Sequence, residues 1–361
     1  MKDKVKLLFV NPHQFGHTAG YYYYSKYLRS EFDVTYLGFD EGLKKLSLSG
    51  ISVIYIHQRK NKFLRVFSFL YEAIRETYKS EYNILYVFSF YFSFIIGMFS
   101  RGTKKIIDIR TYSVATNPRK RYLLNKIINF NTVFFSRAII LTNDMRDLLK
   151  ISSSKIHYLP LGAEKYFDGI HLFDELRLLY VGALNTRNVS QSIEGLSMFL
   201  KQNNFKVNIS YKIVGFGNKG EEDRIRESID KNGLKEFVTF EGRRNYDEIP
   251  YYFRNCNIGI SWIPKTPVFD LQPATKTIEY IMSGLFCMAT STKGNRDLIT
   301  SANGILFEDT PADFALALDY VYKNRHKFNS MRIRETMEEF TWENLVSKNL
   351  LPFLKTLAEK N

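Results

Sequence analysis

A single acidic residue within an apolar helical pattern is the first feature of this chain with an evident chemical use. The pattern runs from Gln272 to Gly284, and its one carboxylate is Glu279. Pro273 and Thr275 stand where a helix would begin, and Gly284 stands where it would end. A carboxylate near a helix start can hold a sugar hydroxyl, and the free backbone N–H groups there can hold a phosphate. The combination suits a nucleotide-sugar, and the alternative is a solvated glutamate on a surface helix.

Arginines follow two strand-like runs in the second half of the chain. Gly182 allows a tight turn at the end of one run, and Arg187 comes just before the next helical pattern. Arginine is suited to bidentate phosphate binding, so Arg187 is a candidate phosphate ligand, with an ordinary surface arginine as the alternative. The loop at Gly242–Arg244, with Arg243 at its centre, is a candidate site for a nucleotide base, although both of its arginines could equally be solvated.

A literal G-x-G-x-x-G at Gly215, Gly217 and Gly220 lies between a strand-like and a helical run. Glu241 follows the next strand at the spacing of a ribose-binding acid. This pattern is typical of dinucleotide binding and keeps an oxidoreductase in view. However, the second half already begins one strand earlier, at Leu176, whereas the fingerprint normally follows the first strand of its sheet.

Polar residues also follow two strand-like runs in the first half. The loop after the first run has glycines that allow close approach to a ligand and histidines that offer polar contacts or are simply solvated. Its candidate residues are His13, Gly16, His17 and Gly20. Asp108 and Arg110 follow the fifth run, where they either face a ligand or form an ion pair that braces the loop.

Strand-like and helical patterns alternate along the whole chain and would position these residues. The expected strands are 6–10, 34–37, 52–56, 84–88, 105–109, 138–141, 176–181, 207–214, 237–240, 258–261, 286–289 and 304–307. The expected helices include 22–30, 61–77, 119–135, 189–202, 220–232, 249–255 and 311–325. This βαβ rhythm runs twice, with a break near 159–173, and predicts two parallel sheets covered by helices. Ligands in such folds lie outside the carboxyl ends of the strands.

Length and charge set further bounds. A chain of 361 residues is long enough for about two domains. Its net charge of +14 is uneven, because residues 1–165 carry 26 Lys+Arg against 12 Asp+Glu, whereas residues 166–361 carry 25 of each. The basic half favours an anionic partner such as a membrane surface, phosphates or nucleic acid, with solubility alone as the alternative.

Membrane spans and secretion are not expected. The uncharged stretch 82–100 barely reaches spanning length and divides into a strand, 83–88, and a buried helix, 90–99. The chain opens Met1-Lys-Asp-Lys-Val-Lys without a secretory signal. Cys256 and Cys287 lie in apolar surroundings without metal spacing, which favours buried thiols in a reducing cytosol.

In order along the chain, several segments resemble the retaining glycosyltransferases of family 4, which have the GT-B fold. The similar segments of the second half are 180–187, 213–217, 238–242, 251–260 and 273–284, followed by 339–343, which looks like the closing Trp helix of the family. The first half is similar more loosely, at 140–144 and 159–164, and Asp108-Ile-Arg110 is similar to a variant in surface-polysaccharide transferases. The resemblance implies that Gly215 and Gly217 form the turn after the second strand of a nucleotide domain, with no dinucleotide role.

The resemblance also implies roles for residues of the donor site. Glu279 matches the second of two family glutamates and would contact the ribose, whereas Leu271 stands where the first would fall. Asp270 or Gln272 would then replace that glutamate. Otherwise the donor sugar would be held by the backbone N–H groups of Ala274 and Thr275. Arg187 matches the family arginine on the diphosphate; Asn188 follows it, so Lys276 is expected to supply the second cation.

The sequence thus predicts an α/β, GT-B protein with two Rossmann-like, doubly wound domains facing across a cleft. Residues 1–165 would form the acceptor-side domain, 170–340 the nucleotide-sugar domain, and a helix at about 344–361 would pack back on the first. The expected activity is retaining, metal-independent sugar transfer from a nucleoside diphosphate sugar to a glycan or lipid-linked glycan in cell-surface polysaccharide synthesis. The alternatives are an NAD-dependent oxidoreductase using the G-x-G-x-x-G at 215–220 and a non-catalytic GT-B-like binding protein.

Several expectations accompany this prediction. Arg187, Lys276 and the helix start near Thr275 would stabilise the departing diphosphate, with no metal and no cofactor beside the donor substrate. The basic first half would meet an anionic membrane, reversibly and in a salt-sensitive way, around 61–75 and 119–126. The protein is expected in the cytoplasm, peripheral at the inner face of the cell membrane, without a nucleic-acid partner.

Overall fold

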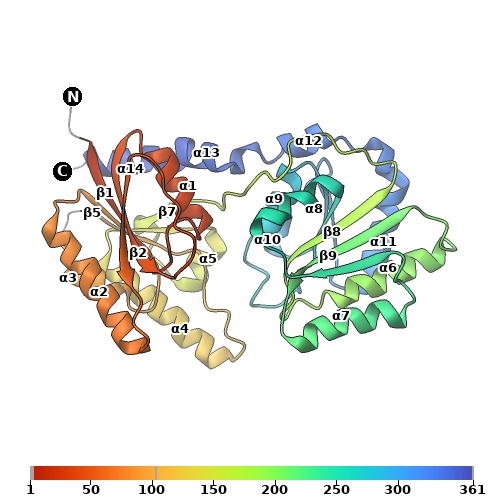
Figure 1. The fold of residues 1–361 in the computed structure, drawn as a ribbon, viewed down its shortest axis with the longest axis horizontal. Coiled ribbons are helices and arrows are strands. Elements are labelled where there is room, and N and C mark those ends of the chain that lie inside the picture. Colours follow the sequence, from red (N-terminus) through yellow and green to blue (C-terminus); the bar gives the residue numbers. More distant parts are fainter. Residues whose placement is uncertain (1–3, 102–103, 360–361) are drawn as a thin grey trace. The chain divides into compact units, whose positions relative to one another are not determined.

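The computed structural model describes residues 4–101 and 104–359. The chain divides into two compact units (Figure 1). Unit 1 comprises 1–160 and 342–361, and unit 2 comprises 161–341. The opening residues 1–3 and the last two residues of the expected closing helix, 360–361, lie outside the described part.

Unit 1 is built on a parallel sheet of seven strands in the order β3-β2-β1-β4-β5-β6-β7 (Figure 1). The strands are β1 Val5–Val10, β2 Phe32–Asp40, β3 Ile51–His57, β4 Ile84–Phe88, β5 Lys104–Asp108, β6 Arg137–Ile140 and β7 Ile156–Tyr158. All six strands predicted for this half are confirmed. The short edge strand β7 was not predicted, because three residues carry too little pattern to stand out.

The helices of unit 1 connect these parallel strands. They are α1 Ala19–Leu28, α2 Lys62–Lys79, α3 Ser93–Phe99, α4 Pro118–Asn131 and α5 Asn143–Leu149. Local chemistry starts them, because the Asn61 side chain accepts hydrogen bonds from two N–H groups of α2 and Asn117 caps α4, whose first residue is Pro118. Neighbouring members of the series α2, α3, α4 and α5 contact one another.

The segment from Trp342 onward belongs to unit 1 although unit 2 precedes it in the chain. It contains α13 Trp342–Leu345, a π-helical stretch Val346–Leu350 and α14 Leu351–Glu359. Trp342 stacks on Tyr23 of α1 at 5.3 Å, and Asn349 lies 2.6 Å from the ring of His157. Its leucines complete the apolar core between α1 and the sheet.

Unit 2 repeats the architecture with a six-stranded parallel sheet in the order β10-β9-β8-β11-β12-β13. The strands are β8 Leu176–Ala183, β9 Ile209–Phe216, β10 Val238–Gly242, β11 Ile258–Ser261, β12 Phe286–Thr290 and β13 Gly304–Phe307. All six correspond to predicted strands. The strand order reverses between β8 and β11, which makes their carboxyl ends the switch point of the sheet.

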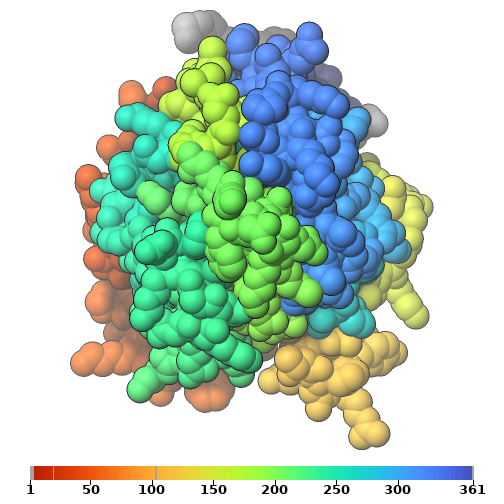
Figure 2. Space-filling view, turned by 90° about the vertical axis from the view of Figure 1, so that its right-hand side faces the viewer, coloured from red at the N-terminus to blue at the C-terminus, as the bar shows by residue number. Residues whose placement is uncertain are grey.

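The helices of unit 2 are α6 Ser190–Gln202, α7 Lys219–Lys231, α8 Ile249–Asn255, α9 Thr275–Met282, α10 Lys293–Arg296, α11 Pro311–Asn324 and α12 Ser330–Glu335. Figure 2 looks onto one helical layer, in which α6 lies between α7 and α11 and contacts both. The buried cluster beneath contains both cysteines, as expected.

Across the described residues, the structure contains no helix that is long and apolar enough to cross a membrane. The uncharged stretch 82–100 instead supplies the buried strand β4, as the sequence predicts, and the helix α3. The expectation that this helix is buried is wrong in part, because Met98 and Phe99 of α3 are exposed.

Candidate functional site

The candidate site lies in unit 2, at the carboxyl ends of β8 and β11. Gly182 is the penultimate residue of β8 and has φ +147°, and a Cβ atom at this position would lie only 2.9 Å from the Nζ atom of Lys276. Gly215, at the end of the neighbouring β9, packs so closely that its Cβ would lie 2.1 Å from the Gly182 carbonyl oxygen. Glycine at these two places therefore lets the strand ends and the lysine share one small space.

Lys276 is a buried cation. Its Nζ atom forms no hydrogen bond or ion pair with any residue that the structure describes, and it lies 3.8 Å from the centre of the Tyr180 ring. Burial, together with the nearby charge of Arg187, lowers the pKa of Lys276 to about 7. Its charge is therefore poorly stabilised and would be better stabilised by a bound anion.

Arg187 is a second cation in the same condition. It lies in a turn whose flanking residues Thr186 and Asn188 both have positive φ, at 59° and 53°. The guanidinium lies 3.7 Å from the centre of the Phe269 ring, and its buried Nη1 atom has no hydrogen-bond partner among residues 4–101 and 104–359. Burial lowers the pKa of Arg187, although an arginine remains charged at neutral pH.

Lys276 is the second residue of α9, and Arg187 lies close enough to lower its pKa. No side chain caps that end of the helix, since its N-cap residue is Ala274 and the first helical residue, Thr275, is exposed. A bare helix N-terminus carries partial positive charge and unused N–H donors. Two unpaired cations beside it form a site suited to an anion with several oxygen atoms, such as a diphosphate.

Glu279 lies on the second turn of α9, inside the helix predicted from the sequence. Its carboxyl group accepts a hydrogen bond from the Tyr166 hydroxyl at 3.4 Å. Burial and, to a smaller extent, the neighbouring Glu164 raise the pKa of Glu279 to about 7, whereas Lys276 opposes the shift. Most of its hydrogen-bonding capacity is therefore left for a hydroxyl-bearing ligand.

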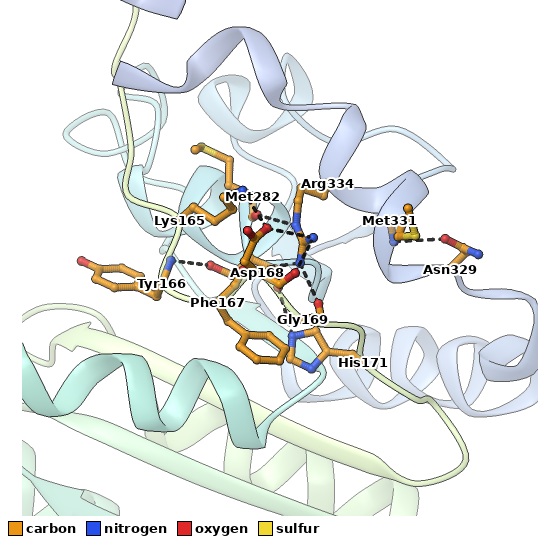
Figure 3. Close-up of polar contacts among 11 residues, drawn as sticks. Lys165, Tyr166, Phe167, Asp168, Gly169, His171, Met282, Asn329, Met331 and Arg334 are labelled. Carbon is orange, nitrogen blue, oxygen red and sulfur yellow. Dashed lines mark hydrogen bonds and ion pairs between the residues drawn. The ribbon is translucent and has the colours of Figure 1, made fainter. Parts of the chain in front are cut away.

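The segment that carries Tyr166 is anchored by Arg334 of α12 (Figure 3). The Arg334 guanidinium donates to the carbonyl oxygens of Asp168 and Gly169, and its Nε donates to Met282 at the end of α9. The Tyr166 N–H also bonds to the Ser283 hydroxyl at 3.1 Å. These bonds hold the segment on α9 and thereby fix Tyr166 next to Glu279.

The residues expected to replace the missing first glutamate serve the local backbone. The Asp270 carboxylate accepts from the Lys293 N–H at 3.0 Å, so it holds the start of α10. The Gln272 carbonyl oxygen lies against Gly294, where an added Cβ would approach it to 2.6 Å. Both residues lie in the loop between β11 and α9 beside Phe269, so they border the site.

The G-x-G-x-x-G does not form an open phosphate loop. The Asn218 side chain caps α7 by accepting from the Glu221 N–H at 3.0 Å, so a protein oxygen already occupies that helix end. The Glu241 carboxylate accepts from the Tyr252 hydroxyl at 3.2 Å and pairs with Arg244. The acid that a dinucleotide ribose would need is thus engaged within the protein.

The remaining predicted donor-side residue, Arg243, follows β10. Its guanidinium lies 4.8 Å from the centre of the Phe216 ring, which is at the end of β9. This arginine is exposed and forms no ion pair. Arg243 and Phe216 together offer flat faces at the rim of the sheet, which suit contact with a planar ring.

In unit 1, the predicted loop residues follow β1. His13 lies 3.5 Å from the Glu41 carboxylate, and the His17 ring lies 3.0 Å from the Lys44 carbonyl oxygen. Gly16 lies against the Leu46 side chain, and Gly20 falls within the first turn of α1. The two histidine rings are exposed, and this loop lies at the switch point between β1 and β4.

Asp108 and Arg110 form the ion pair that the sequence left as the alternative. The Arg110 Nε atom lies 2.7 Å from the completely buried Asp108 carboxylate. Arg110 also donates to the Tyr24 hydroxyl and to the Leu159 carbonyl oxygen, and the Tyr21 hydroxyl donates to Asp108. Burial raises the pKa of Asp108, and the Arg110 charge counteracts the shift. These contacts brace the loop after β5.

Sequence reasoning missed four residues that shape the site in unit 2. They are Tyr166, Tyr180, Phe269 and Arg334. The Tyr180 ring lies against Lys276 and the Phe269 ring against Arg187, and each pair is more than 80 residues apart in the sequence, so no local pattern indicates these contacts. Tyr166 lies in the stretch taken as an irregular boundary, and Arg334 acts from 55 residues beyond Glu279, so no local pattern indicates either.

Comparison with known proteins agrees with this geometry. Residues 167–338 match the family model described as glycosyl transferases group 1. No curated protein sequence matched the chain significantly.

Solved structures with the same fold are numerous. A glycosyltransferase from Rickettsia africae superposes with a TM-score of 0.74 at 18% identity, over 99% of this chain and 100% of that one. Anabaena HepE in complex with UDP superposes with a TM-score of 0.73 at 14% identity, over 98% of this chain and 100% of that one. Sucrose-phosphate synthase from Thermosynechococcus elongatus superposes with a TM-score of 0.72 at 16% identity, over 98% of this chain and 99% of that one.

The protein has the GT-B fold, with two Rossmann-like units that each carry a parallel sheet. Unit 2 in addition matches, along most of its length, the sequence model of group 1 glycosyl transferases. The unpaired cations, the bare start of α9 and Glu279 all lie within the matched residues.

Proposed function

We propose that the protein is a glycosyltransferase that uses a nucleoside diphosphate sugar as donor. The observation that carries this proposal is the pair of unpartnered cations, Arg187 and Lys276, at the switch point of unit 2 beside the uncapped start of α9. The match of 167–338 to the glycosyl transferase model supports it, as does the UDP bound to HepE, a protein of the same fold.

Each site residue contacts a different part of the donor. Arg187 and Lys276 bind the diphosphate, and the N–H groups at the start of α9 add further donors. Glu279, held by Tyr166, accepts from the hydroxyl groups of the nucleotide ribose. Arg243 and Phe216 lie where a planar base can be received, after β10 and β9.

Breaking the bond between the anomeric carbon and the diphosphate leaves negative charge on the phosphate oxygens. Positive groups that are already in place stabilise that charge without reorganisation, which lowers the barrier. Arg187, Lys276 and the helix start supply this stabilisation, so we propose that the reaction is independent of a metal ion. We further propose retention at the anomeric carbon, in line with the resemblance to family 4, and assign no protein nucleophile.

The acceptor belongs to the same proposal. We assign it to a glycan or lipid-linked glycan of cell-surface polysaccharide synthesis, presented at the inner face of the cell membrane. The loop after β1, with exposed His13 and His17, lies at the switch point of unit 1, where a polar acceptor can be contacted. The basic character of residues 1–165 supports an anionic membrane as partner.

The test is a donor panel of UDP-, GDP- and dTDP-sugars, with sugar release and transfer followed by mass spectrometry in the presence and absence of EDTA. We expect turnover of at least one donor, unchanged by the chelator, and a product whose anomeric configuration by NMR equals that of the donor. Loss of activity with EDTA that magnesium or manganese restores would contradict metal independence. Nucleotide binding without turnover of any donor would favour a non-catalytic binding protein.

A further inference from the structure

Exposed apolar side chains concentrate on one part of unit 1. Of the 27 large apolar side chains that are exposed among the described residues, 15 lie between Phe63 and Val133. This range contains α2, α3 and α4, and α3 contacts both of the others. We call these three helices, with the residues joining them to the strands, the α2–α4 face (Figure 1). Exposed apolar area of this kind marks a surface that meets a partner.

Helix α2 is the clearest element of this face. Its outward side carries Phe63, Phe67 and Tyr71, spaced four residues apart, with exposed fractions of 79%, 71% and 61%. Its opposite side is buried in the core of unit 1 through Phe69 and Leu70, among others. A helix needs one apolar side to pack on its sheet, so the second, aromatic side is not explained by the fold.

The neighbouring helices extend this surface. The Tyr78 hydroxyl at the end of α2 donates to the Phe99 carbonyl oxygen at the end of α3. Exposed apolar residues then continue through α3 and α4. They are Phe92, Met98, Phe99, Tyr122, Leu123, Ile127 and Phe130.

Charge on the α2–α4 face has one sign. Outside β5, residues 59–133 include twelve Lys+Arg, of which Arg110 is paired with the buried Asp108, and three Asp+Glu. Two of those acids are engaged, because Glu72 pairs with Arg75 and Glu76 lies 3.9 Å from Lys79. The fourteen residues of α4 contain no acid at all. The accessible charge is therefore almost wholly positive.

We propose that the α2–α4 face binds an anionic lipid bilayer by inserting the aromatic side of α2 between the head groups. Aromatic and leucine side chains on one side of a helix, rimmed by Lys and Arg, are the composition of helices that lie in the membrane interface. The inference deepens the proposed function, on which it rests for the membrane-borne acceptor, by naming the attaching residues. It also changes the expected mode of attachment from charge alone to charge with apolar insertion.

A second copy of the chain is the competing occupant. The common symmetric dimer would bring the same basic patch of each copy together. Eleven basic residues with few free acids would then lie opposite the same residues of the second copy, which is unfavourable. An anionic lipid surface satisfies the aromatic stripe and the positive rim together.

The depth of insertion can be read with tryptophan. Both native tryptophans, Trp262 and Trp342, are buried and form a constant background. In Phe67→Trp, we expect emission to shift to shorter wavelength on anionic phosphatidylglycerol vesicles and to be quenched by brominated lipid. The control is Leu316→Trp, on the exposed side of α11 in unit 2, which should show neither change.

The contribution of the stripe is measured by sedimentation with the same vesicles. Phe63→Ser combined with Phe67→Ser should lower the partition coefficient by tenfold or more, because each lost ring would otherwise leave water on binding. The matched control, Leu316→Ser with Tyr320→Ser, removes two exposed apolar side chains four residues apart on α11 and should bind like the wild type. Salt should weaken wild-type binding without abolishing it.

Distinct outcomes would overturn the proposal. Binding that high salt abolishes and that the Phe63/Phe67 variant retains would mean attachment by charge alone. A concentration-dependent dimer in analytical ultracentrifugation that the same variant dissociates, with no vesicle binding, would assign the face to a second copy. Nucleotide binding by calorimetry, which unit 2 should retain in this variant, separates failure of the membrane proposal from failure of the proposed activity.

Discussion

Both units place charged groups after strands of a parallel sheet but treat them in opposite ways. In unit 1, Arg110 and Asp108 neutralise each other after β5, and tyrosines and a carbonyl take the remaining bonds. In unit 2, Arg187 and Lys276 follow β8 and β11 and lie against aromatic rings without an anion. A satisfied network stabilises the fold, whereas unsatisfied buried cations cost stability and are expected where a ligand completes them.

The largest effect should come from breaking the network of unit 1. We expect Arg110→Ala to lower the free energy of unfolding by about 3 kcal/mol or more, because it leaves the buried Asp108 carboxylate without its counter-charge. Urea denaturation measures this. The double variant Asp108→Asn/Arg110→Met should lose much less, and an equal loss in both variants would mean that the pair does not hold the loop.

Arg187 should show the opposite profile. Arg187→Ala is expected to lower turnover by about 10²–10³, because it removes a preorganised charge that acts on the leaving diphosphate, while thermal stability changes little. The control is Arg226→Ala, since Arg226 also lies over an aromatic ring, that of Phe240, but on α7. Turnover at the wild-type rate by Arg187→Ala would show that this arginine does not act on the leaving diphosphate.

Glu279 tests the ground-state contact with the ribose. We expect Glu279→Gln to weaken donor binding by about 1.5–3 kcal/mol, which corresponds to a charge-assisted hydrogen bond, with the fold retained. Tyr166→Phe removes only the hydroxyl that orients Glu279 and should cost less. Isothermal titration calorimetry with the donor nucleotide measures both affinities. Unchanged affinity in Glu279→Gln would show that Glu279 does not bind the ribose.

The pH dependence of donor binding is the smallest effect. Lys276 has a pKa of about 7, and a bound diphosphate raises it by favouring the charged form. Above pH 7, Lys276 therefore takes up a proton when the donor binds. The affinity for the donor should fall as the pH rises, by at most about tenfold per pH unit.

Other groups near Lys276 must be separated from this effect. They are Arg187, Glu279, Cys287 and the ring of Tyr180. Glu279 also titrates near 7, whereas burial raises the pKa of Cys287 out of this range. The measurement is therefore calorimetry of Glu279→Gln in buffers of different ionisation enthalpy between pH 6.5 and 8.5. An affinity independent of pH would show that Lys276 keeps its charge in the empty site.

The comparison between the units also explains what the sequence could predict. All twelve predicted strands are present, because each buried parallel strand is a continuous apolar run bounded by turns. The nature of Asp108 and Arg110 stayed open, since two charged residues at a strand end look alike whether they face a ligand or each other. Only the positions of Tyr24 and Leu159, far away in sequence, decide the question.

The proximity of Arg187, Lys276 and Glu279 was predictable because they lie in short, ordered segments. Arg187 and Glu279 both lie close enough to Lys276 to shift its pKa, and the roles of the three in donor binding stay predictions. The support of Glu279 by Tyr166 and Arg334 depends on contacts between segments more than 110 and 160 residues apart. Such contacts follow from tertiary packing and leave no periodic trace in the chain.

The path of the chain between the units has a consequence for its synthesis. Unit 2 is inserted between Pro160 and Trp342, and its two ends meet where Ala163 pairs with Thr341. At usual translation rates of about 5–20 residues per second, making the insert takes about 9–36 s. During that time the nascent first sheet and α1 lack Trp342 and the helices that cover them. Unit 1, whose synthesis begins before that of unit 2, is thus completed after it, and Tyr23 of α1 stays without its stacking partner until then.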